Sequence, residues 1–381
     1  MLLKKAYIEM NREQIRKNNP LSQEQYNELK RRYYENCDTT ADLIKEFNLV
    51  GIKSSQLYLL FEDVITQEKC PYCGNFMKHL PLSRQSKFFD RDLECTNCNH
   101  KYYKYPYELC KCENCVNKRK YEIWKFFQTE HSIDFGTLSE ITAFERIYLG
   151  TLHLYGRDED KGYILPYSQQ KENLTFWDED EEEDLFNSLY EKRCLVISSK
   201  SDVADFRFDR DNKFDLDDGC VSPPYELWLD ENDSLKLSQG NVLRGLDKTD
   251  YWIEINRKEA KYYLMRIFEG NYIRHYNGNK VNKIIKDYSV EFSLAEIFSV
   301  IKYVTSSHLY DFHLKKISKQ EAVEKIFYHL ESYYKWAKSN RENVNKYSQK
   351  IMLDDVTYMT MYFYERVLGD KKFFYSKPKD F

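Results

Sequence analysis

Seven of the ten cysteines in this chain lie between Cys70 and Cys115. Four of them form two C-x-x-C pairs, Cys70-Pro-Tyr-Cys73 and Cys95-Thr-Asn-Cys98. The two sulfurs of such a pair lie on one tight turn, so two pairs together supply the four ligands of a tetrahedral zinc ion. Four thiolates leave no open coordination position. The spacing therefore predicts a structural zinc site rather than a catalytic one.

A glycine follows the first pair, at Gly74. Such a turn uses backbone conformations that a Cβ atom disfavours, so glycine suits this position. Residues 70–98 resemble a zinc ribbon of the rubredoxin-like kind. Between the pairs and after them, aromatic residues alternate with basic ones that include Arg84 and Lys101. This pattern is typical of platforms for single-stranded nucleic acid, and packing of the rings around the metal is the alternative.

A third cysteine cluster, Cys110-Lys-Cys112-Glu-Asn-Cys115, has a role that the sequence leaves open. Cys112 and Cys115 form another C-x-x-C pair, and Cys110 is a further ligand candidate. A second zinc needs one more ligand, for which the nearby candidates are His100, His79 and Cys37. Alternatively, one zinc binds Cys112 and Cys115 in place of an earlier pair. We predict one structural zinc at the first two pairs and a partial second site at this cluster.

The start of the chain does not resemble a secretory signal. Lys4 and Lys5 lead into a polar amphipathic stretch rather than an apolar core. Clustered cysteine pairs without an export signal indicate metal binding in a reducing cytoplasm rather than disulfides. No stretch approaches the roughly 18 apolar residues of a membrane span. We therefore expect a cytoplasmic protein with no membrane contact.

The net charge of −4 is unevenly distributed. Residues 1–120 contain 21 Lys and Arg against 16 Asp and Glu, and residues 234–381 contain 26 against 18. Residues 157–233 contain only 9 against 23. Contact with nucleic acid is therefore expected at the basic ends. The acidic middle is a candidate surface for a protein partner.

Apolar spacing and capping residues predict helices over 2–17, 22–36 and 39–47, and a further helix from Ser54 after a turn at Gly51. The last two resemble a helix-turn-helix, in which the start of the second helix meets base edges. A three-helix unit without a ligand is the alternative. The resemblance predicts nucleic-acid contacts by Arg31, Arg32, Lys53, Ser55 and Gln56.

In the middle of the chain, apolar spacing and capping residues predict helices over 137–155 and 178–192, followed by strands at 195–198 and 206–208. The first of these helices is expected to open with a capping box at Thr137. Two helices and a hairpin resemble a winged helix, although the negative charge opposes a grip on phosphate.

The remainder of the sequence indicates helices over 249–268, 293–316, 318–338 and 353–368. Thr249 or Asp250 is the expected cap of the first of these, and Gly369 is expected to end the last. Capping boxes are expected at Ser293 and Ser318, as at Ser22 before the helix over 22–36. The fold class is therefore mainly α with small β elements, in several domains. The expected divisions are 1–65 helix-turn-helix-like, 66–117 zinc ribbon, 118–235 winged-helix-like and acidic, and 236–381 helical.

No catalytic motif is present in the sequence: there is no glycine-rich phosphate loop and no G-x-S-x-G turn. His308 and His313 lie about 140° apart around one predicted helix, which makes a poor chelate. Cys194 and Cys220 have no neighbouring histidine and are expected to be buried thiols. The sequence therefore favours a role other than catalysis and leaves an enzyme of scattered catalytic residues as an alternative.

These patterns together predict a zinc-binding and nucleic-acid-binding regulator or recognition component, with DNA favoured over RNA. The order of segments loosely resembles prokaryotic proteins of mobile-element or phage-defence loci. A protein-interaction scaffold with a structural zinc is the first alternative. A nuclease-like enzyme with scattered catalytic residues is the second.

Overall fold

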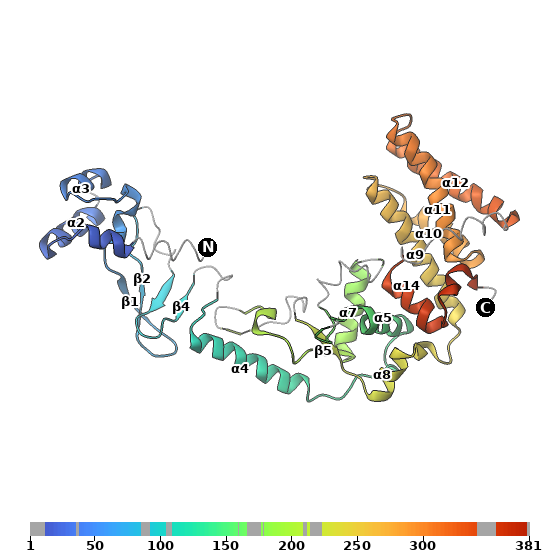
Figure 1. Cartoon of the computed structure of the whole chain (residues 1–381), viewed down its shortest axis with the longest axis horizontal. Coiled ribbons are helices and arrows are strands. Elements are labelled where there is room, and N and C mark those ends of the chain that lie inside the picture. Colours follow the sequence, from blue (N-terminus) through green and yellow to red (C-terminus); the bar gives the residue numbers. More distant parts are fainter. Residues whose placement is uncertain are drawn as a thin grey trace. The chain divides into compact units, whose positions relative to one another are not determined.

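The computed structural model describes residues 12–35, 38–84, 92–103, 109–158, 160–165, 177, 179–208, 212–213, 223–340 and 356–378. The chain divides into unit 1, residues 1–126 with 206–216, and unit 2, residues 127–205 with 217–381 (Figure 1). It is mainly α-helical with one four-stranded and one two-stranded sheet, which confirms the predicted fold class. The finer division into four domains stays a prediction. No helix within the described ranges is long and apolar enough to cross a membrane.

Unit 1 begins with short helices around a small apolar core. After the helical residues 12–18 come α2 (Gln23–Glu35), α3 (Thr40–Glu46) and the 3-10 helix η1 (Ser54–Leu60). The capping box before α2 is confirmed, because the Gln25 amide donates to Ser22 Oγ (3.2 Å) and the Ser22 amide donates to Gln25 Oε1 (3.0 Å). The core side chains include Leu29, Tyr33, Leu43, Leu57 and Phe61.

The sheet of unit 1 has strands β1 (Val64–Lys69), β2 (Phe76–His79), β3 (Leu93–Cys95) and β4 (Lys101–Tyr102). They are antiparallel neighbours in chain order. The buried apolar residues at this sheet are Met77 and Leu93, beside Cys70 and Cys95. Such a small core provides little hydrophobic stabilisation, so the sheet needs another source of stability.

Arg84 connects the segment after β2 to α2. Its guanidinium donates to the carbonyls of Tyr33 (2.6 Å) and Arg32 (3.1 Å) and lies over the Tyr33 ring, 4.6 Å from the centroid. These contacts occupy Arg84 within the fold. Its place in a nucleic-acid platform stays a prediction.

The first part of unit 2 contains α5 (Ala143–Tyr155), α7 (Glu179–Glu191), β5 (Leu195–Ile197) and β6 (Tyr225–Leu227). β5 pairs with β6, so the prediction that it pairs with residues 206–208 is wrong.

The predicted capping box at Thr137 is also wrong. The box is formed by Thr142 and Glu145, and α5 begins after it. Both errors concern the segment that resembles a winged helix.

The rest of unit 2 is a group of packed helices (Figure 1). Its elements are α8 (Glu231–Ser238), α9 (Lys248–Gly270), α10 (Gly278–Glu291), α11 (Leu294–His313), α12 (Lys319–Ser339), α14 (Tyr358–Tyr362) and the π-helix η6 (Phe363–Leu368). The capping boxes at Ser293 and Ser318 are confirmed. Asp247 caps α9, so the predicted cap at Thr249 or Asp250 is wrong. Gly369, with φ of 94°, ends η6 as predicted. The sequence did not predict α8 or α10.

Two carboxylates of the acidic middle, and Glu145 before it, have partners inside unit 2. Glu181 forms an ion pair with Lys258 of α9, and buried Glu182 accepts a hydrogen bond from Tyr148 Oη (3.0 Å). Buried Glu145 lies 2.6 Å from Lys192 Nζ. Burial raises the pKa of Glu145, but hydrogen bonds from Lys192, Ser188 and Thr142 outweigh it and lower the pKa to about 2.

Candidate metal centre

Two separate groups of four metal-ligating side chains lie in unit 1, among the residues that the structure describes. Within each group, the ligand atoms all lie within 4.8 Å of one another. The first group contains the four predicted residues Cys70, Cys73, Cys95 and Cys98. The second contains His100, Cys110, Cys112 and Cys115.

The sulfur atoms of the first group have nearly tetrahedral spacing. Cys70 Sγ lies 3.5 Å from Cys98 Sγ, and Cys73 Sγ lies 3.4 Å from Cys95 Sγ and 3.6 Å from Cys98 Sγ. A Zn–S bond of about 2.3 Å gives a tetrahedron with edges of about 3.8 Å. The four thiols therefore fit a zinc ion with little movement.

The two C-x-x-C turns of this group have matching backbones. The Cys70 amide donates to the Asn75 carbonyl (2.8 Å), and the Cys95 amide donates to the His100 carbonyl (2.7 Å). The residue after each pair has a positive φ, 72° at Gly74 and 56° at Asn99. Glycine and asparagine tolerate this left-handed conformation best. The predicted reason for Gly74 is thus confirmed.

Local hydrogen bonds favour the thiolate form of Cys73. The Asn75 side chain lies 3.5 Å from Cys73 Sγ, and hydrogen bonds from its side chain and backbone lower the pKa of Cys73 to about 6. Burial instead raises the pKa of Cys70 and of Cys98. Because the thiolate is the form that binds metal, the Asn75 donors favour ligation by Cys73.

The second group is assembled around the His100 ring. His100 Nδ1 lies 3.2 Å from Cys115 Sγ and 3.9 Å from Cys112 Sγ. Cys110 Sγ accepts from the amides of Lys101 (3.0 Å) and Cys112 (3.4 Å). Cys115 is the third residue of α4 (Glu113–Glu130), so the start of this helix positions one ligand. All four are buried or half-buried.

This arrangement decides between the alternatives for the third cysteine cluster. Of the three candidate ligands, His100 joins the cluster, whereas His79 Nδ1 hydrogen-bonds to the Leu80 carbonyl (2.6 Å). Cys37 lies outside the described residues. A single metal shared with Cys112 and Cys115 does not fit, because the first group is complete without them.

Tyr72 links the two groups. It belongs to the first C-x-x-C turn, but its hydroxyl lies 3.4 Å from Cys115 Sγ of the second group. Asn212 Nδ2 donates to the Tyr72 oxygen (3.1 Å) and also lies 3.5 Å from Cys115 Sγ, so Tyr72, Asn212 and Cys115 form one hydrogen-bonded set. The Tyr72 ring also packs edge-on against His100, with centroids 5.0 Å apart.

Arg119 completes this outer layer of the second group. It donates to Asn212 Oδ1 (2.5 Å) and to the Cys110 carbonyl (2.7 Å). The cysteine spacing alone does not predict a role for Tyr72, Arg119 or Asn212. Arg119 follows Cys115 by four residues and so lies on the same helix face, which was a usable signal. Asn212 is far away in sequence and gave none.

The predicted nucleic-acid residues Arg31 and Arg32 have carboxylate partners. Arg31 forms ion pairs with Glu28 (2.8 Å) and Glu35 of α2. Arg32 joins Asp38 (2.7 Å) and Glu46 (2.7 Å), so it connects α2 with α3. These pairs reduce the positive charge that either arginine presents to a phosphate.

Lys53, Ser55 and Gln56 lie at the start of η1. Lys53 and Ser55 are exposed, while the Gln56 side chain accepts from the Lys53 amide (3.3 Å). These three residues therefore lie at the N-terminal end of a seven-residue 3-10 helix rather than on a regular α-helix.

The histidines and cysteines outside the two ligand groups were also candidates for a site in the sequence. His308 Nε2 lies 2.5 Å from His329 Nδ1, and His313 Nε2 lies 2.6 Å from Asn271 Oδ1, so the two predicted histidines do not meet. Cys194 is a buried thiol, as predicted. Cys220 lies outside the described residues.

Comparisons of the chain with family models, with curated proteins and with solved structures find no match.

Proposed function

We propose that unit 1 binds two structural zinc ions and carries a surface for single-stranded nucleic acid. The first part rests on the two complete groups of four ligands. Sets of four cysteines, or of three cysteines with one histidine, are typical of structural zinc, and a complete set leaves no position for a substrate. The resemblance of residues 70–98 to a zinc ribbon supports the same conclusion.

An exposed aromatic pair on α4 supports the second part. Tyr121 and Trp124 are 57% and 56% exposed, and their ring centroids lie 5.9 Å apart with an interplanar angle of 29°. Exposed rings of this kind offer flat faces for unpaired bases. Lys120 is exposed beside them and adds positive charge for a phosphate. Because stacking needs unpaired bases, this surface favours single strands over duplexes.

The test measures binding of the full-length, zinc-loaded chain to a fluorescent single-stranded oligonucleotide over a series of salt concentrations. Trp124→Ala should weaken binding by about 1–3 kcal/mol, the typical contribution of one base–aromatic stack. Because tryptophan is uncharged, the salt slope should not change. Lys120→Gln should instead lower that slope by about 0.7.

Tyr310→Ala is the matched control, because Tyr310 is also an exposed aromatic residue but lies on α11 of unit 2. Zinc content, measured for each variant, should stay at the wild-type value. Equal affinity of wild type and the Trp124 variant would contradict the proposed surface.

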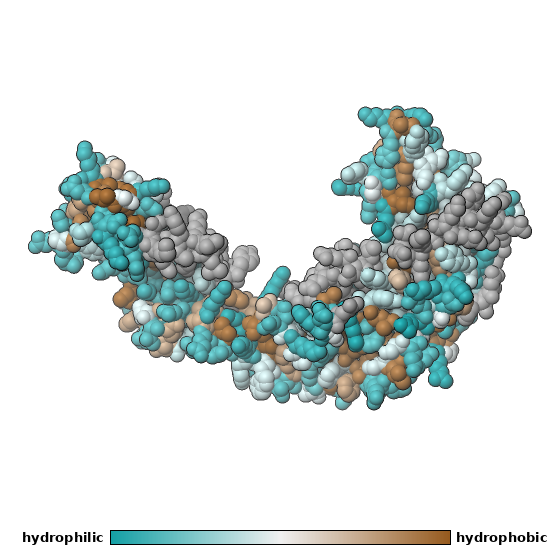
Figure 2. Space-filling view, in the orientation of Figure 1, coloured by the Kyte–Doolittle hydropathy of each residue, from teal (hydrophilic) through white to brown (hydrophobic). Residues whose placement is uncertain are grey.

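A protein-interaction scaffold is the second candidate, and exposed apolar residues favour it. Val64, Ile65 and Phe76 lie exposed on β1 and β2. The face of unit 1 drawn in Figure 2 shows apolar patches among polar residues. Zinc-loaded protein that binds neither DNA nor RNA at low salt would favour this candidate. A role as a regulator or in phage defence stays a prediction from the sequence.

A further inference from the structure

Unit 2 contains an open cleft of about 890 Å³. It lies among the segment that follows α9, the start of α10 and the start of α12. Small-molecule sites in proteins have volumes of roughly 300–1,000 Å³, so the cleft has room for a ligand of that class.

Three basic side chains line this cleft. Arg274, Lys280 and Lys319 form no ion pair within the described part of the chain, although Lys319 Nζ donates to the Tyr272 carbonyl (2.6 Å). Glu324 is the one carboxylate among the described lining residues, and it accepts from Gln320 Nε2 (3.1 Å). Basic groups without carboxylate partners around a concave surface attract anions.

The remaining lining combines three aromatic side chains, Tyr272, Tyr276 and Phe327, with Val323 and polar residues that include His275. Phe327 and Val323 of α12 are buried beneath it, Tyr276 is half-buried, and Tyr272 is 77% exposed at the edge. Lys280 Nζ lies 5.6 Å from the centroid of the Phe327 ring. The aromatic and cationic parts of the cleft are therefore adjacent. A ligand with a flat ring and an anionic group matches both parts.

We propose that this cleft binds a nucleotide, with its phosphate near Arg274, Lys280 and Lys319 and its base against the half-buried ring of Tyr276. The N-terminal ends of α10 and α12 lie at the cleft, and their partial positive charges add to the attraction for phosphate. The nucleotide is either free or part of a nucleic-acid strand, since both present the same phosphate and base. The proposal does not depend on the surface proposed for unit 1.

Isothermal titration calorimetry of the full-length chain tests the site with ADP, adenosine and inorganic phosphate. ADP should bind more tightly than either part alone. Arg274→Gln and Lys280→Gln should each weaken ADP binding by about 10-fold or more, because hydrogen bonds to charged groups contribute roughly 1.5–3 kcal/mol.

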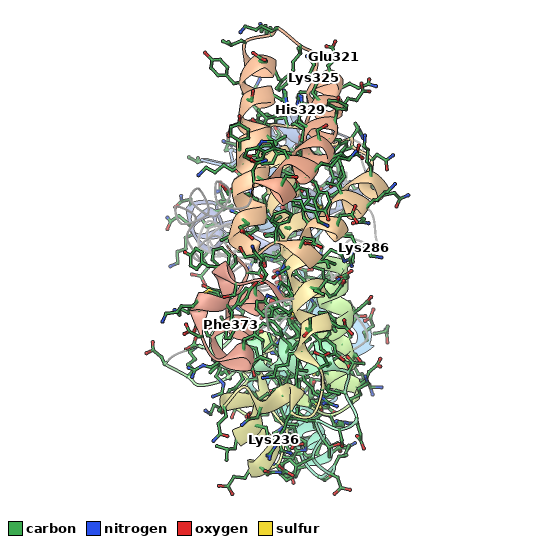
Figure 3. The ribbon with its side chains drawn as sticks, turned by 90° about the vertical axis from the view of Figure 1, so that its right-hand side faces the viewer. Lys236, Lys286, Glu321, Lys325, His329 and Phe373 are labelled. Atoms are coloured by element: carbon green, nitrogen blue, oxygen red, sulfur yellow. The ribbon has the colours of Figure 1, made fainter. Side chains whose placement is uncertain are left out.

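Lys286→Gln is the matched control, because it makes the same charge change on α10 outside the cleft. In Figure 3, Lys286 lies far along the helices from Glu321, which belongs to the first turn of α12. The Lys286 variant should bind ADP with wild-type affinity.

A 5′-phosphorylated oligonucleotide distinguishes the two sources of the nucleotide. If the oligonucleotide binds more tightly than ADP, and the Arg274 variant loses this binding, the ligand is a nucleic-acid strand. If the oligonucleotide binds no more tightly than ADP, the ligand is a free nucleotide. The proposal is overturned if neither ADP nor the 5′-phosphorylated oligonucleotide binds. It is also overturned if the Arg274 and Lys286 variants bind ADP equally, or if inorganic phosphate binds as tightly as ADP.

Discussion

Removal of one hydroxyl group, in Tyr72→Phe, should weaken metal binding at the second ligand group and leave the first unchanged. This result is counter-intuitive from the sequence, because Tyr72 lies between Cys70 and Cys73 of the first group. In the structure, however, its hydroxyl lies 3.4 Å from Cys115 Sγ and accepts from Asn212 Nδ2. The substitution removes the hydroxyl group that contacts Cys115 Sγ and leaves Asn212 without this acceptor.

Loss of a side chain that hydrogen-bonds to a metal ligand typically lowers metal affinity by about 10- to 100-fold, and we expect a loss of this size at the second group. This corresponds to about 1.4–2.7 kcal/mol. Zinc release to a coloured chelator measures the affinity. Cobalt substitution assigns it to a group, because a site with four thiolates and a site with three thiolates and an imidazole have different visible spectra.

Asn97→Ala is the matched control for Tyr72→Phe. Asn97 occupies the same place in the second C-x-x-C turn, and its side chain is exposed. The reasoning is refuted if Tyr72→Phe releases metal from the four-thiolate group before the second group, or if both variants keep wild-type affinity at the second group.

Three further predictions concern stability, measured by chemical unfolding of the full-length chain. Gly74→Ala should destabilise unit 1 by about 1–2 kcal/mol, because a Cβ is unfavourable at a φ of 72°. Glu145→Gln should remove a contribution of about 3 kcal/mol that is complete above pH 4.5 and disappears as the pH falls to about 2, because the folded-state pKa is depressed to about 2. Ser293→Ala should cost about 1 kcal/mol by removing the cap of α11, and an undiminished unfolding midpoint would contradict it.

Features that depend on neighbouring residues could be predicted from the sequence. The C-x-x-C spacing places two sulfurs on one turn whatever surrounds it, and the first ligand group follows from that spacing alone. The capping boxes at Ser22, Ser293 and Ser318 are equally local, since each needs only two side chains three residues apart. These predictions are confirmed.

Features that depend on distant residues could not be predicted. Thr137 and Thr142 both have a glutamate three residues later, and the sequence does not show which of the two boxes forms. Contacts with distant residues select the box at Thr142. The first turn of α5 places Glu145 in a buried position, where it pairs with Lys192. The choice of His100 as the fourth ligand likewise required the strand positions that bring it to Cys115.

The two ligand groups have no ligand in common, but His100 and Tyr72 connect them within this small sheet. The His100 carbonyl accepts from the Cys95 amide (2.7 Å) in the turn of the first group, while Nδ1 of the same residue faces the second group. Tyr72 lies in the turn of the first group, and its hydroxyl contacts Cys115 of the second group. Filling the first group would therefore fix a ligand of the second before metal arrives there, which lowers the ordering cost of the second event. With few apolar side chains in the sheet, we infer that metal binding at both groups supplies most of the free energy that folds it.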